Sequence, residues 1–307
     1  MYKKGKDLFV FMSYIELYKK GILEDIKNKL LQQLKSCRLC PRQCKVNRED
    51  NQLGFCKTGR FAKVDSFFLH FGEEPELVGR GGSGTIFFSN CNLGCIYCQN
   101  YTISHFGEGK VVYPKELAEI MLNLQKRGAE NINFVTPTHI LPQILEALVI
   151  AIEGGLVLPL VYNCGGYESG EILSLIKGVF DIYMPDIKYS YNTIGLRLSS
   201  VPDYWDKVKE AVIKMHNDVG DLVIEKGVAK KGLLVRHLVL PNRLAGSFAV
   251  LDFIKENISS CTYVNIMDQY HPCYKAGEIF ELTRRINKEE YLEVVSYAKR
   301  IGLYRGF

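Results

Sequence analysis

Three cysteines within eight residues constrain this chain more than any other feature of its sequence. Cys91, Cys95 and Cys98 follow the apolar, β-branched run 85–88. A loop at the end of a strand can bend all three sulfurs toward one point, and thiolates select zinc, Cu(I) or iron–sulfur clusters. A closed structural site needs four protein ligands, and these three come without an adjacent fourth. On a four-iron cluster they would leave one iron open, which predicts a reactive site.

The spacing C-x3-C-x2-C, with Tyr97 before the last cysteine, resembles the signature of the radical S-adenosylmethionine (SAM) superfamily. The flanking segments 84–88 and 99–101 resemble homologues of pyruvate formate-lyase activating enzyme, and the resemblance extends from about residue 37 to residue 271. It implies that the three cysteines hold a [4Fe–4S] cluster whose open iron binds SAM. One electron would then cleave SAM to methionine and a 5′-deoxyadenosyl radical, while the protein binds and shields the cofactors. A zinc loop is the main alternative, because motif matches carry false positives.

A second group of cysteines lies upstream, at Cys37, Cys40, Cys44 and Cys56. Four thiolates from two loops predict a second metal centre, either zinc or an auxiliary [4Fe–4S] cluster. Three cysteines within eight residues favour a cluster, whereas paired C-x2-C knuckles would favour zinc, and both remain open. The centre would act as an electron relay or simply staple a small subdomain.

Composition places the chain among cytoplasmic, soluble proteins. Of its 307 residues, 47% are hydrophobic and 24% are charged, which is typical of globular proteins. Cysteines that cluster in this way indicate metal binding in a reducing compartment. The apolar run 8–12 is too short for a secretory signal, and charged, glycine and proline residues interrupt the run 145–161, so we expect no membrane span. The net charge of +5 does not indicate a nucleic-acid partner.

From residue 85 onward the chain alternates short β-rich runs with helical patterns. This alternation predicts parallel βα units in an α/β fold. A doubly wound open sheet fits equally well, and the resemblance favours a partial (β/α)6 TIM-like barrel. Residues 61–307 would form the barrel, and residues 1–60 a cysteine-rich extension with amphipathic helices between 8 and 34. The expected strands are 85–89, 132–135, 158–162, 179–184, 233–240 and 263–267, and the expected helices are 115–127, 140–153, 170–177, 203–217, 246–256 and 288–299.

Ligands of such folds bind at the carboxyl ends of the parallel strands. Asp186 and Lys188 alternate on one face at the end of the fourth strand. The resemblance places them in the active site, so both are predicted to be catalytic; a plain surface ion pair is the alternative. The segment 189–202 is long for a βα loop and is predicted to govern substrate specificity.

The resemblance also implies SAM contacts at other strand ends. The relatives carry a Gly-Gly-Glu type segment where this chain has Thr136-Pro137-Thr138-His139, so hydroxyls replace a carboxylate. Thr138 is alternatively a helix N-cap, and His139 is expected to pack. Arg236 is suited to binding the SAM carboxylate. The predicted cofactor-binding residues are Tyr97, Thr136, Thr138, Asn163, Gly165, Gly166, Arg236 and His271.

Some of these positions have competing interpretations. Asn163-Cys164 stands where the relatives carry an Asp-Thr pair for a monovalent cation, and a plain glycine turn after it is the alternative to a SAM contact. His271 matches the position that contacts the adenosyl group in the relatives. His237 alternates to the face opposite Arg236 and is expected to be structural.

Two further motifs lie just before the first expected strand. The run 79–84 matches G-x-G-x-x-G, but it precedes a strand instead of opening a helix, so it is not a dinucleotide-binding loop. Its glycines are expected to let the backbone pass close to the cysteine loop. His70, Glu73 and Glu74 are expected on a surface loop, and lining of the cluster mouth is the alternative.

Three functions follow from these features. The first is a radical SAM oxidoreductase of the activating-enzyme type, which abstracts hydrogen from a glycine of a partner protein. The second keeps this chemistry but acts on another protein, an RNA or a small molecule. The third is a non-catalytic metal-binding or electron-carrier module. The first two require an electron donor such as flavodoxin or ferredoxin.

Overall fold

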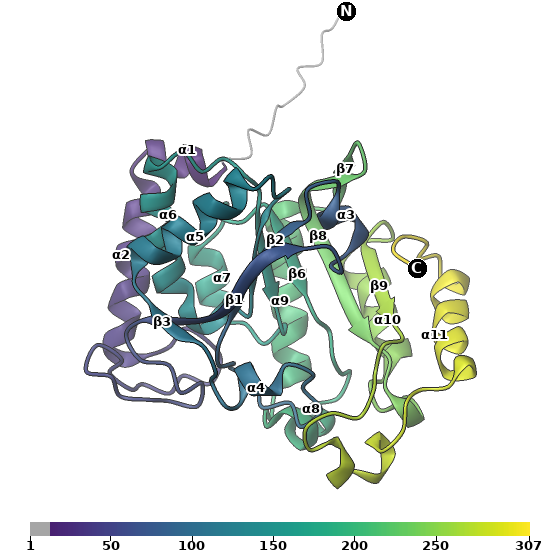
Figure 1. Cartoon of the computed structure of the whole chain (residues 1–307). Coiled ribbons are helices and arrows are strands. Elements are labelled where there is room, and N and C mark those ends of the chain that lie inside the picture. Colours follow the sequence, from purple (N-terminus) through teal and green to yellow (C-terminus); the bar gives the residue numbers. More distant parts are fainter. Residues whose placement is uncertain (1–12) are drawn as a thin grey trace, which may run out of the picture.

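The computed structural model describes residues 13–307, and the earlier part of the predicted N-terminal helical region, residues 8–12, lies outside them. Within the described part this region is helical, in α1 (Tyr14–Lys19) and α2 (Ile22–Gln32). Three leucine and isoleucine side chains of α2 are buried, and the helix packs on α6 (Leu141–Glu153). The N-terminal helices therefore cover the outside of the main body (Figure 1).

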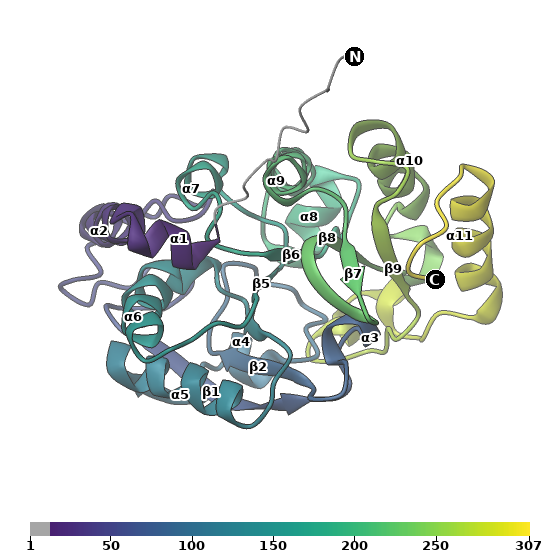
Figure 2. The same cartoon turned by 90° about the horizontal axis from the view of Figure 1, so that it is seen from above.

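The predicted α/β partial barrel is confirmed by the sheet. Six strands run parallel, and each forms hydrogen bonds with the parallel strand that follows it in the sequence. Seen from above, they curve around a common interior with the helices outside (Figure 2). The strands are β2 (Ser83–Phe88), β4 (Ile132–Val135), β5 (Leu160–Cys164), β6 (Ile182–Pro185), β8 (Val228–Leu238) and β9 (Tyr263–Met267).

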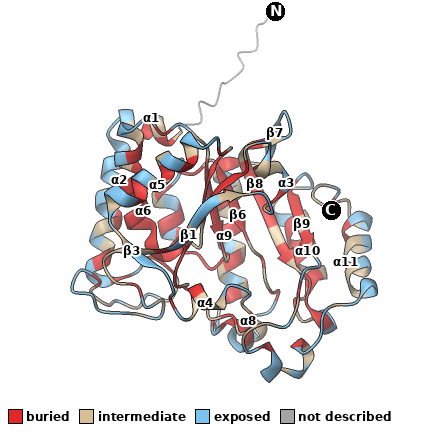
Figure 3. Cartoon of the chain, viewed as in Figure 1, coloured by how far each residue is buried: buried red, intermediate tan, exposed pale blue. Residues whose placement is uncertain are grey.

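The helices between these strands agree with the predicted ranges to within a few residues. Each is amphipathic and turns its apolar side inward, so the buried surface concentrates between helices and sheet (Figure 3). The outer helices are α5 (Pro114–Lys126), α6, α7 (Gly170–Leu175), α9 (Tyr204–Val219), α10 (Ser247–Asn257) and α11 (Lys288–Arg300). Short α-helices are α3 (Pro75–Val78), α4 (Tyr101–Ser104) and α8 (Asn192–Ser199), and 3-10 turns are Gln33–Ser36, Thr138–Ile140, Pro241–Arg243, Ala276–Glu278 and Phe280–Leu282.

Three antiparallel strands were not predicted. β1 (Ala62–His70) pairs with β2, β3 (Lys110–Val112) pairs with β1, and β7 (Val223–Glu225) pairs with β8. Within residues 13–307 no ladder joins β9 to the strands β1–β3, so the barrel stays open along this side. Helix α3, which follows β1, packs against β8 across the opening.

The expectation for the glycine run 79–84 was wrong in one respect. The run precedes β2, as expected, but a Cβ added at Gly81 would lie only 1.8 Å from the carbonyl oxygen of Gly128. Gly128 follows α5 and lies at the amino-terminal end of β4, whereas the cysteine loop follows the carboxyl end of β2. Glycine therefore permits a close backbone approach at the end of the barrel remote from the cysteines.

The interior of the barrel is divided into two layers. A closed apolar cluster that includes Val161, Ile182, Leu234 and Tyr263 fills the amino-terminal part of the interior, together with Leu77 of α3. Polar side chains occupy the next positions toward the carboxyl ends of the strands, among them Asn163 and Arg236. The fold thus leaves polar chemistry at the end of the barrel where the cysteine loop lies. Among residues 13–307, no helix is long and apolar enough to cross a bilayer.

Candidate active site

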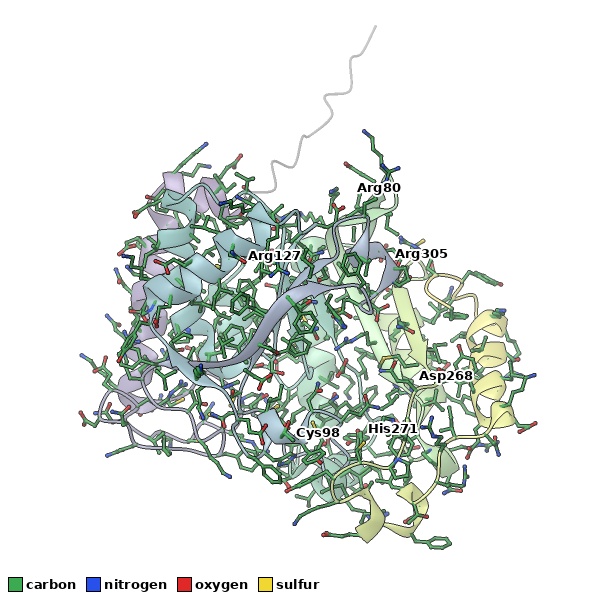
Figure 4. All side chains as sticks on the ribbon, viewed as in Figure 1. Arg80, Cys98, Arg127, Asp268, His271 and Arg305 are labelled. Carbon is green, nitrogen blue, oxygen red and sulfur yellow. The ribbon has the colours of Figure 1, made fainter. Side chains whose placement is uncertain are left out.

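The cysteine loop connects β2 to α4 at the carboxyl ends of the parallel strands. Cys98 is labelled in Figure 4 at the lower end of the sheet, with His271 beside it and Arg80 at the opposite end. Cys95 is buried, whereas Cys91 and Cys98 are partly exposed. Burial raises the pKa of the Cys91 and Cys95 thiols, and the ammonium group of Lys188 opposes this increase.

The segment 189–202, which was predicted to govern specificity, contains α8 and holds the cysteine loop in place. The amide nitrogen of Gly94 donates to the carbonyl of Ser199 at 3.0 Å, and that of Ile96 donates to Leu198 at 2.9 Å. The hydroxyl of Ser199 lies 2.9 Å from the sulfur of Cys95. A hydroxyl in this position can donate a hydrogen bond to a thiolate, so α8 belongs to the surroundings of the metal ligands.

Tyr97 extends this network. Its hydroxyl lies 2.6 Å from that of Tyr189, which lies 2.9 Å from the hydroxyl of Ser199. The ring of Tyr97 also packs edge-on against Tyr270, with the centroids 5.9 Å apart. Tyr97 is therefore buried behind the loop, and its predicted role in cofactor binding stays a prediction.

A buried charged cluster lies inside the barrel beside the cysteines. The Nζ of Lys188 is 2.6 Å from Oδ2 of Asp186, and Nε of Arg236 is 2.9 Å from Oδ1 of the same carboxylate. Nη2 of Arg236 donates to Oδ1 of Asn163 at 2.7 Å. Burial alone would raise the pKa of Asp186, but the two cations outweigh it and the pKa lies below its ordinary value. The structure brings together these four predicted residues, from β5, β6 and β8.

The glycine turn after β5 allows the charged cluster to approach the cysteine loop. A Cβ added at Gly165 would lie 2.5 Å from Leu93 in the loop, so the two segments are in close contact. Gly166 has a φ of 79°, which side chains rarely adopt, and its Cβ position lies 2.3 Å from the carbonyl oxygen of Asp186. Glycine is therefore required at position 166, whereas a side chain at position 165 would displace Leu93.

Glu73 and Glu74 were expected on a surface loop, and this expectation was wrong. Oε1 of Glu73 is 3.5 Å from Nη1 of Arg236, and Oε2 accepts a 2.9 Å hydrogen bond from Asn133. Both oxygens of Glu74 accept from Asn265 on β9, at 2.8 and 2.9 Å. The segment after β1 thus enters the barrel through its open side. The signals for this were two adjacent glutamates before Pro75 and asparagines within otherwise apolar strands.

Other predicted residues are less central. Thr136 has a φ of 63°, unusual for a β-branched residue, and such strain often accompanies functional sites. Thr138 does not cap α6; its hydroxyl donates to the buried carboxylate of Glu168 at 2.7 Å, on the helix side of the sheet. His271 is partly exposed, with Nδ1 3.3 Å from Nε2 of Gln99 in the cysteine loop. His237 is buried, and its Nδ1 forms a hydrogen bond with the carbonyl of Ile187, as expected of a structural residue.

The four upstream cysteines line one narrow cavity. Two arginines and His139 share its lining. The fully buried Arg48 has Nη1 3.9 Å from the sulfur of Cys37 and 2.7 Å from the carbonyl of His139. Arg42 donates to the carbonyls of Asn92 and Ser200, at 2.6 and 2.9 Å. This arginine therefore fastens the upstream cysteines to the cysteine loop.

Sequence comparison decides the family. A profile of the Radical SAM superfamily matches residues 85–223. The uncharacterized protein MJ0674 of Methanocaldococcus jannaschii is 34% identical over 297 residues, which cover 93% of this chain and 81% of the relative. The chain belongs to the radical SAM superfamily. A second uncharacterized protein of the same organism, MJ0808, is 23% identical over 292 residues, covering 84% of this chain and 79% of the relative.

The radical SAM fold extends over nearly the whole chain. The crystal structure of a radical SAM methyltransferase from Sphaerobacter thermophilus superimposes with a TM-score of 0.52 and 12% sequence identity, covering 96% of this chain and 93% of that one. At this identity the match shows the fold alone. The family profile, and not this structural match, identifies the chain as a radical SAM superfamily enzyme.

Membership of the radical SAM superfamily implies a [4Fe–4S] cluster and SAM. The three cysteines that would hold this cluster, Cys91, Cys95 and Cys98, lie in one loop, and thiolates are the ligands of iron–sulfur clusters. Burial raises the pKa of the Cys273 thiol, and the charge of the nearby Cys98 raises it further.

Proposed function

We propose that this chain cleaves SAM reductively and uses the resulting radical to abstract hydrogen from a substrate held at the carboxyl ends of the barrel strands. The observation that carries this proposal is the position of the Cys91–Cys98 loop directly against Lys188 and its partners. A cluster ligated by three cysteines, when bound, would supply the electron and the open iron site. The residues around it would bind SAM, orient it and exclude water.

The predicted roles are distributed over the ends of five strands. Arg236 donates one hydrogen bond to Asp186 and one to Asn163. Its guanidinium has five N–H donors, so the others could bind the carboxylate of SAM. Asp186 and Lys188 would face SAM and the substrate, and the Gly165-Gly166 turn would pass close beneath them. His271 would approach the adenosyl group from the side of Gln99. Thr136 would occupy the place of the missing carboxylate.

The substrate that we propose is a backbone glycine of a partner protein, presented as an extended loop. This part rests on the resemblance of segments 84–88 and 99–101 to activating enzymes. A glycyl radical signal on a candidate partner is the expected result after incubation with the reduced enzyme and SAM. Production of 5′-deoxyadenosine without such a signal would assign another substrate.

The upstream cysteines would hold an auxiliary [4Fe–4S] cluster in the predicted N-terminal extension, residues 1–60, which packs against the barrel. That all four thiols line one cavity supports a shared metal centre, and three cysteines within eight residues favour a cluster over zinc. The buried Arg48 would offset part of the negative charge that four thiolates place in a buried site.

The decisive experiment is anaerobic reconstitution with iron and sulfide, followed by dithionite and SAM. Wild-type protein should form 5′-deoxyadenosine, and Cys95→Ala should not. Cys273→Ala is the matched control: it removes a neighbouring thiol and should retain SAM cleavage, because the open iron needs no fourth protein sulfur. Absence of SAM cleavage in wild type despite a reduced cluster, or its loss in Cys273→Ala, would contradict the proposal.

A further inference from the structure

A groove of about 390 Å³ runs along the solvent side of the cysteine loop. It is formed by the N-terminal extension, the loop itself, α4 and the segment around residue 274. None of the charged barrel residues Asp186, Lys188 and Arg236 lines it, so it is distinct from the proposed substrate site. Its lining residues are Phe55, Cys56, Lys57, Asn90, Cys91, Leu93, Gly94, Ile96, Ser104, His105, Ser200, Tyr274 and Lys275.

Both groups of cysteines reach this groove. Cys56 belongs to the upstream set and Cys91 to the loop set, and each is partly exposed. A metal centre on either set would therefore lie immediately behind the groove wall. The rate of electron transfer falls steeply with distance, so a carrier seated here would be well placed to reduce both centres.

The charged residues that line the groove are all positive. Lys57 and Lys275 are exposed, and no carboxylate is among the lining residues. Arg42 adds a third cation at the rim, with its guanidinium stacked 3.2 Å from the ring centroid of the exposed Phe55. Lys275 makes only a loose, exposed ion pair, with its Nζ 3.9 Å from Oε1 of Glu278. The positive charge is thus available to a partner.

The groove wall is tied directly to the metal ligands. Nε2 of His105 lies 2.9 Å from the carbonyl of Cys95, and its ring stacks on Tyr274 with the centroids 4.5 Å apart. The amide of Lys275 donates to the carbonyl of Ile96 at 2.9 Å. On the other side, Asn90 holds the Lys57 segment through a 3.1 Å bond to Thr58. A partner would meet a surface that is already ordered.

We propose that this groove docks a small, acidic one-electron carrier protein that reduces the metal centres of the chain. The inference rests on the proposed function, because only a reductive enzyme needs such a carrier. One electron leaves the carrier and enters the cluster, and no covalent bond forms or breaks. Electron-transfer complexes are small and transient, and complementary charge governs mainly their rate of association. The groove is cationic, which favours association with an acidic carrier, and it lies beside the thiolates, which keeps the transfer distance short.

The test compares a protein reductant with a small one. Reconstituted full-length protein is mixed anaerobically with fully reduced flavodoxin, and the loss of cluster absorbance is followed by stopped flow. In the double variant Lys57→Glu/Lys275→Glu, the second-order rate constant should fall at least tenfold at low ionic strength, and its salt dependence should flatten. Reduction by dithionite should remain within twofold of wild type.

Two matched variants complete the design. Lys126→Glu/Lys299→Glu reverses two exposed lysines on α5 and α11 and should leave the flavodoxin rate within twofold. Lys57→Gln/Lys275→Gln should give an intermediate rate, and it replaces the charge reversal if that variant does not fold. Carbodiimide cross-linking should join flavodoxin carboxylates to Lys57 or Lys275, whether or not the protein carries its clusters.

The proposal is overturned if charge reversal leaves the flavodoxin rate unchanged, or if the cross-links map elsewhere. Binding of a single-stranded oligonucleotide is measured in parallel. The proposal is also overturned if charge reversal weakens oligonucleotide binding but leaves the flavodoxin rate unchanged, since the groove would then bind nucleic acid. SAM cleavage driven by dithionite reports separately on the proposed function. If the groove variant still cleaves SAM with dithionite and flavodoxin also reduces it at the wild-type rate, the proposed enzymatic function stands and the docking site is rejected.

Discussion

The carboxylate of Glu73 reaches through the open side of the barrel to Arg236, placing Oε1 3.5 Å from Nη1. The two side chains are only 9% and 18% exposed, so solvent screens this pair weakly. Asp186 and Asn163 hold the other edges of the same guanidinium. Arg236 is therefore fixed from three directions before any ligand arrives, which lowers the entropy cost of binding a carboxylate.

Arg236→Lys should weaken SAM binding at least tenfold, about 1.4 kcal/mol, because an ammonium group cannot keep the Asp186 and Asn163 bonds in the same planar geometry. Glu73→Gln should weaken it less, since Glu73 acts only through the arginine. Equilibrium dialysis of the reconstituted protein measures both effects. Arg197→Lys, in an exposed pair with Glu281, is the control. Wild-type affinity in Arg236→Lys would exclude this arginine from SAM binding.

Ser199→Ala should make the reduction potential of the cluster more negative. A hydrogen bond to a thiolate stabilises the more negatively charged, reduced state, and the Ser199 hydroxyl lies 2.9 Å from the Cys95 sulfur. The shift should be on the order of tens of millivolts, a fraction of the 59 mV that corresponds to a tenfold change in a one-electron equilibrium. Anaerobic redox titration monitored by EPR measures it. Ser174→Ala on α7 should titrate like wild type, and an unchanged or raised potential in Ser199→Ala would be the wrong sign.

Cys37→Ala should remove about half of the bound iron, because we expect two four-iron clusters per chain. Neither the wild-type protein nor this variant should contain zinc. Iron, sulfide and zinc analysis after reconstitution checks this, with Cys261→Ala as an exposed-thiol control. The Cys95→Ala protein should retain the other half of the iron. Zinc in the wild-type protein that disappears in Cys37→Ala would assign a zinc site instead, and unchanged metal content would remove the second centre altogether.

Glu168 should make the stability of the protein fall between about pH 4.5 and about pH 7. Burial raises the pKa of this carboxyl from 4.5 to about 7, although Thr138 and Tyr162 donate hydrogen bonds to it. The folded state then binds a proton that the unfolded state has released, so stability decreases as the pH rises through this window. In Glu168→Gln this contribution should vanish, and Tm should change less between pH 5 and 8. Thermal unfolding over that range measures the difference, with Glu171→Gln on the exposed side of α7 as control. Parallel pH profiles of wild type and Glu168→Gln would contradict the assignment.

Part of the site could be predicted because its signals are local. The spacing of Cys91, Cys95 and Cys98 identifies ligands within one loop, and the alternation of apolar runs after residue 85 indicates parallel strands, whose carboxyl ends meet at one edge. Asp186, Lys188 and Arg236 follow from that rule, since each lies near a strand end. The strand β1 carried no such signal: the adjacent residues Phe67 and Phe68 point to opposite faces of the strand, yet both are exposed, so its pattern does not alternate cleanly.

The sequence by itself determined the ligand chemistry and the order of the barrel, because spacing and periodicity are properties of contiguous residues. Only the tertiary structure decided that Glu73 turns inward to Arg236, that α8 delivers Ser199 to Cys95, and that Arg42 fastens the two groups of cysteines together. These contacts join segments far apart in the chain. Whether a polar side chain becomes buried there depends on which partner the packing of other elements brings to it, and no local pattern encodes that.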